Sequence, residues 1–380
     1  MTGTHDVATQ VRVAADAGTA LRIEGRGTWL GANRPVRANA TLSLADCAGI
    51  VDYVPGDLTL TARAGTPLTE IAHAAREHGQ WLALDPYGGD GGSIGATVAT
   101  ASYGPHAATF GTPRNHVLGF EFVTGAGDIV RGGGRVVKNV AGFDLVRLGT
   151  GAWGTLGVIT EVTVRLRALP NAHETVVAAW PDGDASEAWC AALRRLATAP
   201  YACELVNGSL AARLGLPARP MLIVRVAGNR ESVRAQRDAL AHLEPGGFDA
   251  INDDIWTKLR AGSAAQDAVW RLSRGPAQFA STWREAVIAT SAFDGAQLHG
   301  SPLSGVARCV VSPVADQADD LAALDKAITQ PFDGTRVGEQ LPANAWSAFP
   351  SAVTDRLSRG IRAAFDPRGI LNPGIMGDAA

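Results

Sequence analysis

Apolar and polar residues follow two different periods along this chain, and the period changes from one segment to the next. A repeat of about 3.6 residues indicates an amphipathic helix, and strict alternation indicates a strand with one buried face. In the first part of the chain these patterns predict a helix at Val7–Ala17, strands at Leu21–Glu24 and Leu58–Ala64, a helix at Leu68–His78, and a hairpin of Val117–Val123 with Ile129–Arg131. Thr66 is expected to cap the second helix, with Pro67 in its first turn and Gly79 at its end. Together these elements predict an α+β domain that ends near Pro170.

A second α+β block begins at Thr175. Its pattern predicts, in order, a strand at Thr175–Trp180, a helix at Ser186–Ala197, strands at Ala202–Asn207 and Met221–Ala227, a helix at Glu231–Leu243, and a strand at Val269–Ser273. This β-α-β-β-α-β order is typical of the split-βαβ, ferredoxin-like arrangement. Later signals predict a strand at Arg308–Val314 and helices at Asp316–Ile328 and Ser351–Phe365, and no internal repeat is visible. We therefore expect a domain at 1–170, a second at 171–345 and a C-terminal segment at 346–380.

Three glycine-rich loops interrupt the first domain, at Ile23–Trp29, Pro86–Gly95 and Gly149–Gly157. The last two lead toward β-branched, strand-like sequence. Glycines at this density let a backbone approach a ligand closely, and successive amide N–H groups in such loops suit phosphate oxygens. Each loop alone is as well explained by an ordinary turn. Three of them in one domain predict a diphosphate cofactor that is held from several sides.

The third loop matches the dinucleotide fingerprint G-x-G-x-x-G at Gly149–Gly154. That fingerprint binds a dinucleotide only where a strand precedes it and a helix follows it directly. Here Val158–Leu166 follows, and its alternating β-branched residues predict a strand. The sequence therefore excludes a Rossmann fold at this loop.

Size and charge narrow the classes of function. The 380 residues are 46% hydrophobic and 19% charged, with a formal net charge of −3. A chain without a basic excess lacks the field that attracts nucleic acid, so no nucleic-acid partner is expected. The N-terminal residues lack the features of a signal peptide, and no apolar run approaches the roughly 18 residues of a membrane helix. We therefore expect a cytoplasmic protein.

No metal site is expected from the cysteines or the histidines. The cysteines lie far apart and form no C-x-x-C pair, which argues against a disulfide scaffold and against iron–sulfur ligation: Cys47, Cys190, Cys203 and Cys309. His73 and His78 are five positions apart on a predicted helix, so their side chains point in different directions and cannot share one ion.

Four segments resemble the vanillyl-alcohol-oxidase, or PCMH-type, FAD-binding family. Ile23–Trp29 resembles its first pyrophosphate loop, and Ser93–Thr100 resembles its second, usually T-I-G-G-x-x-A-T. Lys138–Leu145 with Gly154–Thr160 resembles its G-Y-D-L … G-T-L-G-I-I-T segment. Phe365–Gly374 resembles its C-terminal F-D-P-x-G-x-L-N-P-G. The matches follow the family's order.

The resemblance implies a PCMH-type FAD-binding domain, a ferredoxin-like α+β cap and a C-terminal segment that returns to the first domain. It implies FAD as the cofactor, held mainly by backbone amides of the first two loops. The implied cofactor-binding residues are Gly25, Arg26, Gly27, Thr28, Trp29, Pro86, Gly92, Ser93, Ile94, Gly95, Ala96, Ala99, Ser102, Gly154, Thr155, Gly157, Ile159 and Asn372. Several relatives attach FAD covalently, many through a histidine in the first loop. This chain has none there, and His106 is the only histidine near the second loop, so noncovalent FAD is expected.

Within the family, the K-N-V-A-G-F-D-L motif and the Trp-Arg-Leu-Ser sequence at Trp270 resemble the FAD-binding E subunit of glycolate oxidase. This resemblance implies an oxidoreductase acting on the CH–OH group of a small 2-hydroxy acid, with hydride accepted by the flavin. It implies two partners, a larger FAD-binding subunit and an iron–sulfur subunit that receives the electrons. Through that complex the chain would lie at the inner face of the cell membrane.

One departure from the family concerns the chemistry. Related 2-hydroxy-acid dehydrogenases carry a metal-binding histidine pair and an H-G-x-G segment, whereas only His299 with Gly300 is similar here. His299 is a candidate base, and Arg271 is a candidate to bind a substrate carboxylate, with a structural role as the alternative for each. Lys138 is expected to pair with a cofactor or partner acid, or to form a structural salt bridge. Two other functions stay open: a non-catalytic FAD-binding structural or electron-relay subunit, and a stand-alone alcohol or sugar oxidase.

Overall fold

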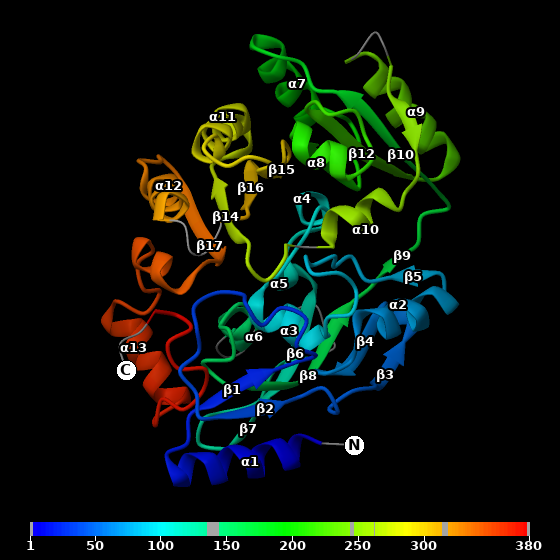
Figure 1. Cartoon of the computed structure of the whole chain (residues 1–380). Coiled ribbons are helices and arrows are strands. Elements are labelled where there is room, and N and C mark those ends of the chain that lie inside the picture. The colour runs from blue at the N-terminus through cyan, green and yellow to red at the C-terminus, as the bar shows by residue number, and fades with distance from the viewer. Residues whose placement is uncertain (1–2, 135–143, 244–246, 262, 314–317, 378–380) are drawn as a thin grey trace. The chain divides into compact units, whose positions relative to one another are not determined.

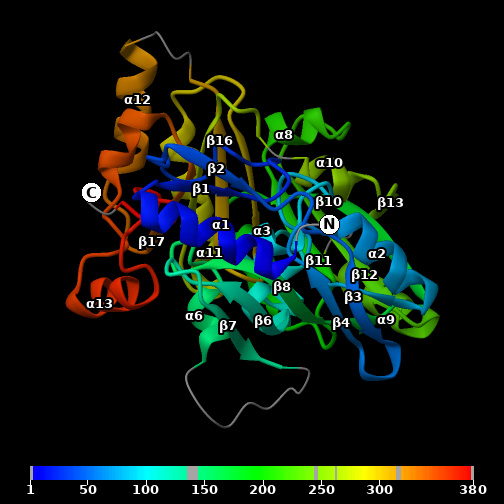
Figure 2. The same ribbon diagram turned by 90° about the horizontal axis from the view of Figure 1, so that it is seen from below.

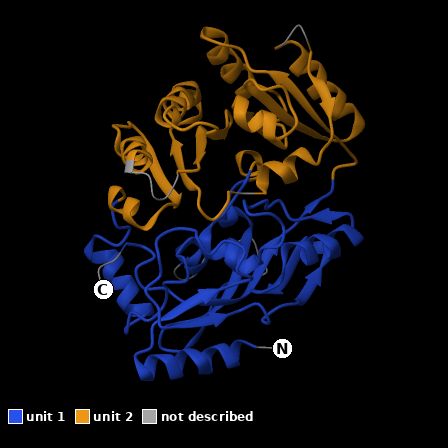
Figure 3. Cartoon of the chain, viewed as in Figure 1, with its two compact units in different colours: residues 1–104, 111–169, 350–380 blue, residues 105–110, 170–349 orange. Residues whose placement is uncertain are grey.

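The computed structural model describes residues 3–134, 144–243, 247–261, 263–313 and 318–377. The chain divides into two compact units, which Figure 3 colours separately. Unit 1 comprises residues 1–104, 111–169 and 350–380, and unit 2 comprises residues 105–110 and 170–349. The short segment 105–110, which the sequence analysis placed in the first domain, therefore groups with unit 2.

Unit 1 combines helices with three sheets, of which two are antiparallel and one, with two strands, is parallel (Figure 1). Its helices are α1 (Thr4–Ala17), α2 (Leu68–Glu77), α3 (Ile94–Thr100), α5 (Pro113–His116), α6 (Leu145–Gly149) and α13 (Arg356–Phe365). Its strands are β1 (Leu21–Glu24), β2 (Ala40–Ser43), β3 (Ile50–Val54), β4 (Thr59–Arg63), β5 (Gln80–Trp81), β6 (Val117–Val123), β7 (Ile129–Gly133), β8 (Val158–Arg165) and β9 (Arg167–Ala168).

The largest sheet of unit 1 has the order β3-β4-β8-β6-β7, with every neighbouring pair antiparallel. Helix α1 lies along this sheet, as the two views show (Figure 1, Figure 2). Its Val7 and Val11 are fully buried, and they belong to one apolar core with Val162 of β8. The parallel pair β1–β2 carries the first glycine loop at the end of β1.

Several predicted elements of unit 1 are confirmed, and three expectations are wrong. The strand Leu21–Glu24 and the hairpin β6–β7 form as expected, and strand β8 after the third loop confirms that this loop is not a Rossmann turn. The sequence after the second loop forms helix α3 instead of a strand. The N-cap of α2 is Pro67 instead of Thr66, and the last helix begins only at Arg356.

Unit 2 is built on one eight-stranded antiparallel sheet. Its strands are β10 (Ala172–Ala179), β11 (Ala202–Val206), β12 (Met221–Gly228), β13 (Asp249–Ile251), β14 (Ala268–Ser273), β15 (Gln297–Ser301), β16 (Val306–Val311) and β17 (Thr335–Gln340). Its helices are α4 (Ala107–Phe110), α7 (Asp184–Arg194), α8 (Gly208–Arg213), α9 (Arg230–Ala241), α10 (Ile255–Arg260), α11 (Phe279–Thr290) and α12 (Ala318–Thr329).

The sheet order β13-β10-β12-β11-β15-β16-β14-β17 contains the same arrangement twice. In β10–β13 and again in β14–β17, the first strand lies between the third and the fourth, and the second strand lies beside the third. The second strands, β11 and β15, pair to join the halves. The expected ferredoxin-like arrangement is thus present, but the strand at Val269–Ser273 opens the second half, and β13 is the fourth strand of the first.

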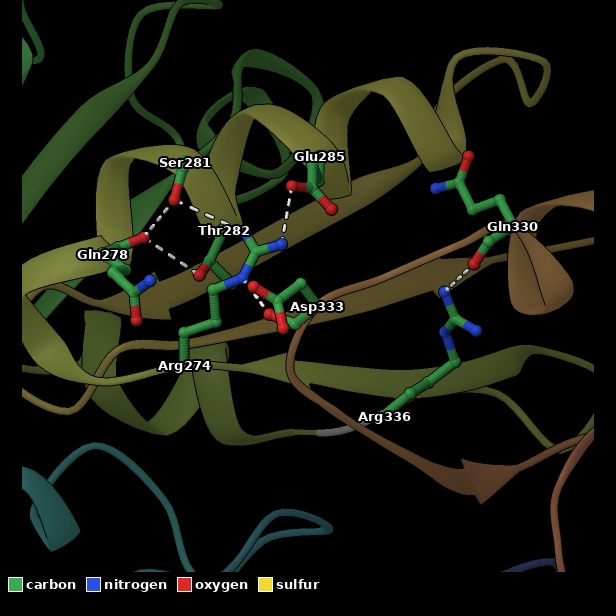
Figure 4. A network of polar contacts seen from close by, with 8 residues as sticks. All are labelled: Arg274, Gln278, Ser281, Thr282, Glu285, Gln330, Asp333 and Arg336. Atoms are coloured by element: carbon green, nitrogen blue, oxygen red, sulfur yellow. Dashed lines mark hydrogen bonds and ion pairs between the residues drawn. The ribbon is translucent and has the colours of Figure 1, made fainter.

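In the second half of the sheet, polar side chains connect the end of β14, helix α11 and the turn before β17 (Figure 4). Arg274, which follows β14, donates hydrogen bonds to Ser281 and Glu285 of α11 and to the carbonyl of Asp333. Its guanidinium also lies 4.3 Å from the centroid of the Phe332 ring. These contacts attach the turn before β17 to helix α11.

Among the residues that the structure describes, no helix is both long and apolar enough to cross a bilayer.

Candidate functional site

The first and second glycine loops, which lie far apart in the sequence, are in direct contact in unit 1. Gly25 packs so closely on the start of α3 that a Cβ there would overlap the Ser93 hydroxyl and lie 3.1 Å from the Ala96 Cβ. Three residues further on, Thr28 lies against Gly92, because a Cβ on that glycine would meet the Thr28 Oγ1 at 3.4 Å. The two loops therefore form one cradle.

The first loop of the cradle offers backbone donors without an acceptor in the described part of the chain. The backbone N–H groups from Gly25 to Trp29 donate no hydrogen bond within the described part of the chain, and Arg26, Gly27 and Thr28 are exposed. The N–H groups of Ile94 and Gly95 behave differently, since they donate to the carbonyls of Thr66 and Ala64 at 3.0 and 2.9 Å. These two amides thus have acceptors inside the chain, and their expected contact with a phosphate stays a prediction.

Ser93 caps helix α3, accepting a hydrogen bond from the Ala96 N–H at 3.4 Å. Gly95 is required by packing instead of by a ligand, because a Cβ there would lie 2.5 Å from the Ala64 Cβ. Both residues therefore place the N-terminal turn of α3 beside the first loop.

The third loop packs against the other end of the same helix. The N–H of Gly151 donates to Val98 O at 3.0 Å, and the N–H of Trp153 donates to Ala99 O at 2.8 Å. The Trp153 ring lies 6.3 Å from the ring of Trp29, centroid to centroid. All three loops thus converge on α3, which agrees with the expectation that they act together.

Asn372 ties the cluster to the C-terminal segment. Its side-chain oxygen accepts from the Ile23 N–H at 2.8 Å, and its side-chain nitrogen donates to Trp153 O at 2.7 Å. Gly154 lies directly beneath it, since a Cβ there would meet the Asn372 nitrogen at 2.9 Å. Its contacts within the chain give Asn372 a positioning role between the first and third loops, and its expected contact with the cofactor stays a prediction.

The remaining residues expected to bind the cofactor lie around this cluster. Thr155 is buried and donates to Ala152 O, Pro86 is buried in the second loop, and the Ser102 N–H donates to Thr97 O after α3. Gly157 and Ile159 line an apolar cavity with Phe122. Packing requires a glycine at Gly157, because a Cβ there would overlap the Phe122 ring. The expected contacts of all the residues in this group with a cofactor stay a prediction.

This geometry fits a dinucleotide with a pyrophosphate at its centre. Unused amide donors on an exposed, glycine-rich loop suit phosphate oxygens, and Gly25 removes the side chain that would separate this loop from α3. Half-buried aromatic rings at Trp29 and Trp153 flank the same loop. The chain therefore has a place for the phosphates and an apolar place for a ring.

Unit 2 carries a second polar cluster, on one face of its sheet. His299 of β15 is buried, and its Nδ1 lies 3.0 Å from Glu204 Oε2 on β11. Because a carboxylate only accepts, Nδ1 carries the proton and the lone pair of the neutral ring lies on Nε2. Burial, aided by the charges of Arg308 and Arg213, holds the pKa of His299 well below its usual value. The ring is therefore neutral and oriented.

Arg271 has a carboxylate partner inside the chain. Its Nε lies 2.5 Å from Glu339 Oε1, and Arg308 Nε bonds the other oxygen at 2.6 Å. Burial alone would raise the pKa of Glu339, but the charges of Arg308 and Arg271 outweigh it and lower that pKa. These ion pairs of the half-buried Arg271 and the buried Arg308 with the buried Glu339 support a structural role for Arg271 over the expected binding of a substrate carboxylate.

His106, the histidine nearest the second loop in sequence, groups with unit 2. Burial lowers its pKa to about 3, with further contributions from the charges of Arg225 and Arg260. Its neighbour in α4, Thr109, donates a hydrogen bond to Pro200 O. The segment around His106 is therefore part of the unit-2 fold.

In the described residues, no three histidine, cysteine or acidic side chains are grouped so that they could hold a metal ion. Lys138 lies outside the described residues, so its expected partner is not tested. Sequence reasoning also missed Trp153 and Glu204. Trp153 is a variable position of the third loop and Glu204 lies on a strand without a motif, so only the positive φ of Trp153 and the pairing of β11 with β15 reveal them.

Known proteins resemble this chain in sequence and in fold. Residues 1–133 match the family described as FAD binding domain. Glycolate oxidase subunit GlcE of Escherichia coli is 32% identical over 275 residues, covering 70% of this chain and 71% of that protein. Glycolate oxidase subunit GlcD of Bacillus subtilis is 25% identical over 388 residues, covering 93% and 82%. The structure of p-cresol methylhydroxylase with substrate bound superposes with a TM-score of 0.75 at 15% identity, covering 99% of this chain and 88% of that one, and shows the shared fold.

Proposed function

Because this chain belongs to the FAD-binding family of glycolate oxidase subunits, with the PCMH-type fold, we propose that it is the FAD-binding subunit of an assembly that oxidises glycolate or a similar 2-hydroxy acid. FAD is its cofactor. The observation that carries the proposal is the convergence of three glycine loops on α3, with unused amide donors on Gly25–Trp29. When bound, FAD supplies an acceptor for two electrons.

The loops of unit 1 would hold the cofactor by its phosphates. The donors of the first loop would bind a phosphate, while Ser93 and Gly95 hold α3 in place beside that loop. Asn372 fixes the distance between the first and third loops. We propose that the FAD is bound noncovalently, because the first loop carries no histidine.

Within unit 2, His299 is the residue that we propose to take the hydroxyl proton of the substrate. Its Nδ1 proton is held by Glu204, so Nε2 is the basic nitrogen. Its lowered pKa leaves this nitrogen unprotonated at neutral pH, so its lone pair can accept a proton. Glu204 is then a positioning residue.

The proposed assembly includes a larger FAD-binding subunit and an iron–sulfur subunit that receives the electrons. The relatives named GlcE and GlcD are described as subunits of glycolate oxidase, which supports such partners. The four cysteines of this chain are all free and buried on separate elements, so we place the clusters on a partner. We also propose a cytoplasmic location, at the membrane only through the complex.

A second function is favoured by one observation. Arg271, expected to bind substrate, is held by Glu339, which Arg308 also binds. A chain that binds FAD as a structural or electron-relay subunit would need no substrate-binding arginine. The third alternative, a stand-alone alcohol or sugar oxidase, has no such support here.

Substitution of the unit-2 dyad distinguishes these functions. In the complete assembly His299→Gln should slow flavin reduction by glycolate by about 10²–10⁴, because the proton acceptor is lost. Glu204→Gln should slow it less, and FAD content should stay unchanged in both variants. His173→Gln, a half-exposed histidine of the same unit, is the matched control. Unchanged rates in both dyad variants would favour the relay subunit.

A further inference from the structure

Trp153 has a backbone conformation that a bulky residue rarely adopts. Its φ is +54°, in the left-handed region that normally favours glycine. Two hydrogen bonds maintain it, from its N–H to Ala99 O and from Asn372 Nδ2 to its carbonyl. Strained residues held in this way cluster at ligand sites, where the strain aims a side chain.

This backbone conformation places the Trp153 ring beside the ring of Trp29. The centroids lie 6.3 Å apart with an interplanar angle of 47°, within the range of aromatic pairs. Trp29 ends the first loop, immediately after the exposed Thr28. The pair therefore lies next to the unused amide donors.

The pair is not part of the apolar core. Both indoles are half-buried, and neither belongs to the core cluster of unit 1. Large aromatic side chains usually bury their area in a core or against a ligand. A half-buried pair of indoles beside a phosphate cradle is therefore explained if the planar ring of a ligand covers their exposed part.

We propose that Trp29 and Trp153 form an aromatic contact for one of the two planar rings of FAD, next to its pyrophosphate. The inference rests on FAD binding at the three loops and adds Trp153 to the residues that bind it. Adenine and the flavin ring share the chemistry that an indole recognises, since stacking depends on a π face. Ligands that carry only adenine or only the flavin ring therefore show which of the two rings the indoles contact.

The test is a calorimetric titration of the apoprotein with FAD, FMN and ADP. Trp153→Leu and Trp29→Leu should each bind FAD about tenfold more weakly, because stacking on an aromatic ring is lost. Trp153→Phe should bind nearly as the wild type does. Trp81→Leu is the matched control, since Trp81 is the remaining tryptophan of unit 1 and lies on β5.

A second variant separates binding from folding. Trp153→Gly removes the ring but suits the positive φ, so it should weaken FAD binding while the apoprotein melts no earlier than Trp153→Phe. A loss of ADP affinity alone assigns the pair to adenine, and a loss of FMN affinity alone assigns it to the flavin ring. Wild-type FAD affinity in all the leucine and glycine variants would overturn the inference. A wild type that does not bind FAD would instead contradict the proposed function.

Discussion

Asn372 and Ile23 are 349 positions apart in the sequence, yet the Ile23 N–H donates to the Asn372 side chain at 2.8 Å. The same side chain donates to Trp153 O, so one amide joins the C-terminal segment, the strand before the first loop and the third loop. The C-terminal segment thus joins the cluster of glycine-rich loops, which gives a physical reason for its similarity to the family's C-terminal motif.

Removing this amide should loosen the site. Asn372→Ala leaves two part-buried backbone groups without this partner, which we expect to lower the free energy of unfolding by about 2 kcal/mol. FAD affinity should fall with it, because the first and third loops are no longer tied. Urea unfolding and FAD titration measure the two effects. Asn344→Ala, an exposed asparagine of unit 2, is the control, and equal behaviour of the two variants would contradict the positioning role.

Gly25 is expected to be essential for the contact between the first loop and α3. In Gly25→Ala the new methyl group would overlap Ser93 Oγ, so the loop must move away from the helix. We expect a loss of FAD binding with most secondary structure kept, measured by titration and circular dichroism. Gly56→Ala is the control, since a Cβ there has no heavy atom within 4 Å. Equal FAD affinity in both variants would show that the contact does not shape the site.

Stability should fall as the pH is lowered through the histidine range. The pKa of His106 is about 3 in the folded chain, below its ordinary value of 6.5, so the unfolded chain binds the extra proton. Stability from this group is complete above pH 6.5 and is lost as the pH falls toward 3. Between pH 7.5 and 5.5 the loss should be about 1.4 kcal/mol for one such histidine.

Urea midpoints of the wild type and of His106→Gln at these two pH values measure this loss. The variant should show the smaller difference between them, although His299 adds a slope of the same sign in both proteins. An identical pH dependence in the two proteins would mean that His106 is not buried as a neutral ring.

Noncovalent attachment makes a direct prediction about the flavin. Acid precipitation of the purified protein should release all the flavin into the supernatant, because no histidine of the first loop can bond to it. Absorbance of the supernatant and pellet measures the division. Flavin that stays with the pellet would require a covalent bond, and peptide mapping would then identify its residue.

Local patterns predicted the elements that depend on neighbours in sequence. The hairpin β6–β7 and strand β8 alternate clearly, and the structure contains them. Helix α3 was missed because Thr97, Val98 and Thr100 favour strands, whereas its capping by Ser93 and its packing on Ala64 make it helical. Tertiary contacts overrode propensity there.

Pairings between distant segments could not be predicted from the sequence. The doubled ferredoxin-like arrangement became visible only through the order of β13 and β17 in the sheet, since the two halves share no sequence repeat. The partnership of His299 with Glu204 depends on β11 lying beside β15. Motifs identified the loops, but the use of the Ile94 and Gly95 amides by backbone carbonyls depends on packing that no motif encodes.

The most direct test of the proposed function is an anaerobic visible spectrum of the FAD-loaded chain, taken before and after glycolate is added. We expect the flavin to stay oxidised in the isolated chain, because the metal-binding histidine pair of related dehydrogenases has no counterpart here to act beside His299. It should bleach when the larger flavoprotein and the iron–sulfur subunit are present. Omitting glycolate from the same assembly is the control. A flavin that stays oxidised in the complete assembly would contradict the proposal that this chain takes part in 2-hydroxy-acid oxidation, and rapid, stoichiometric bleaching of the isolated chain would contradict its dependence on partners.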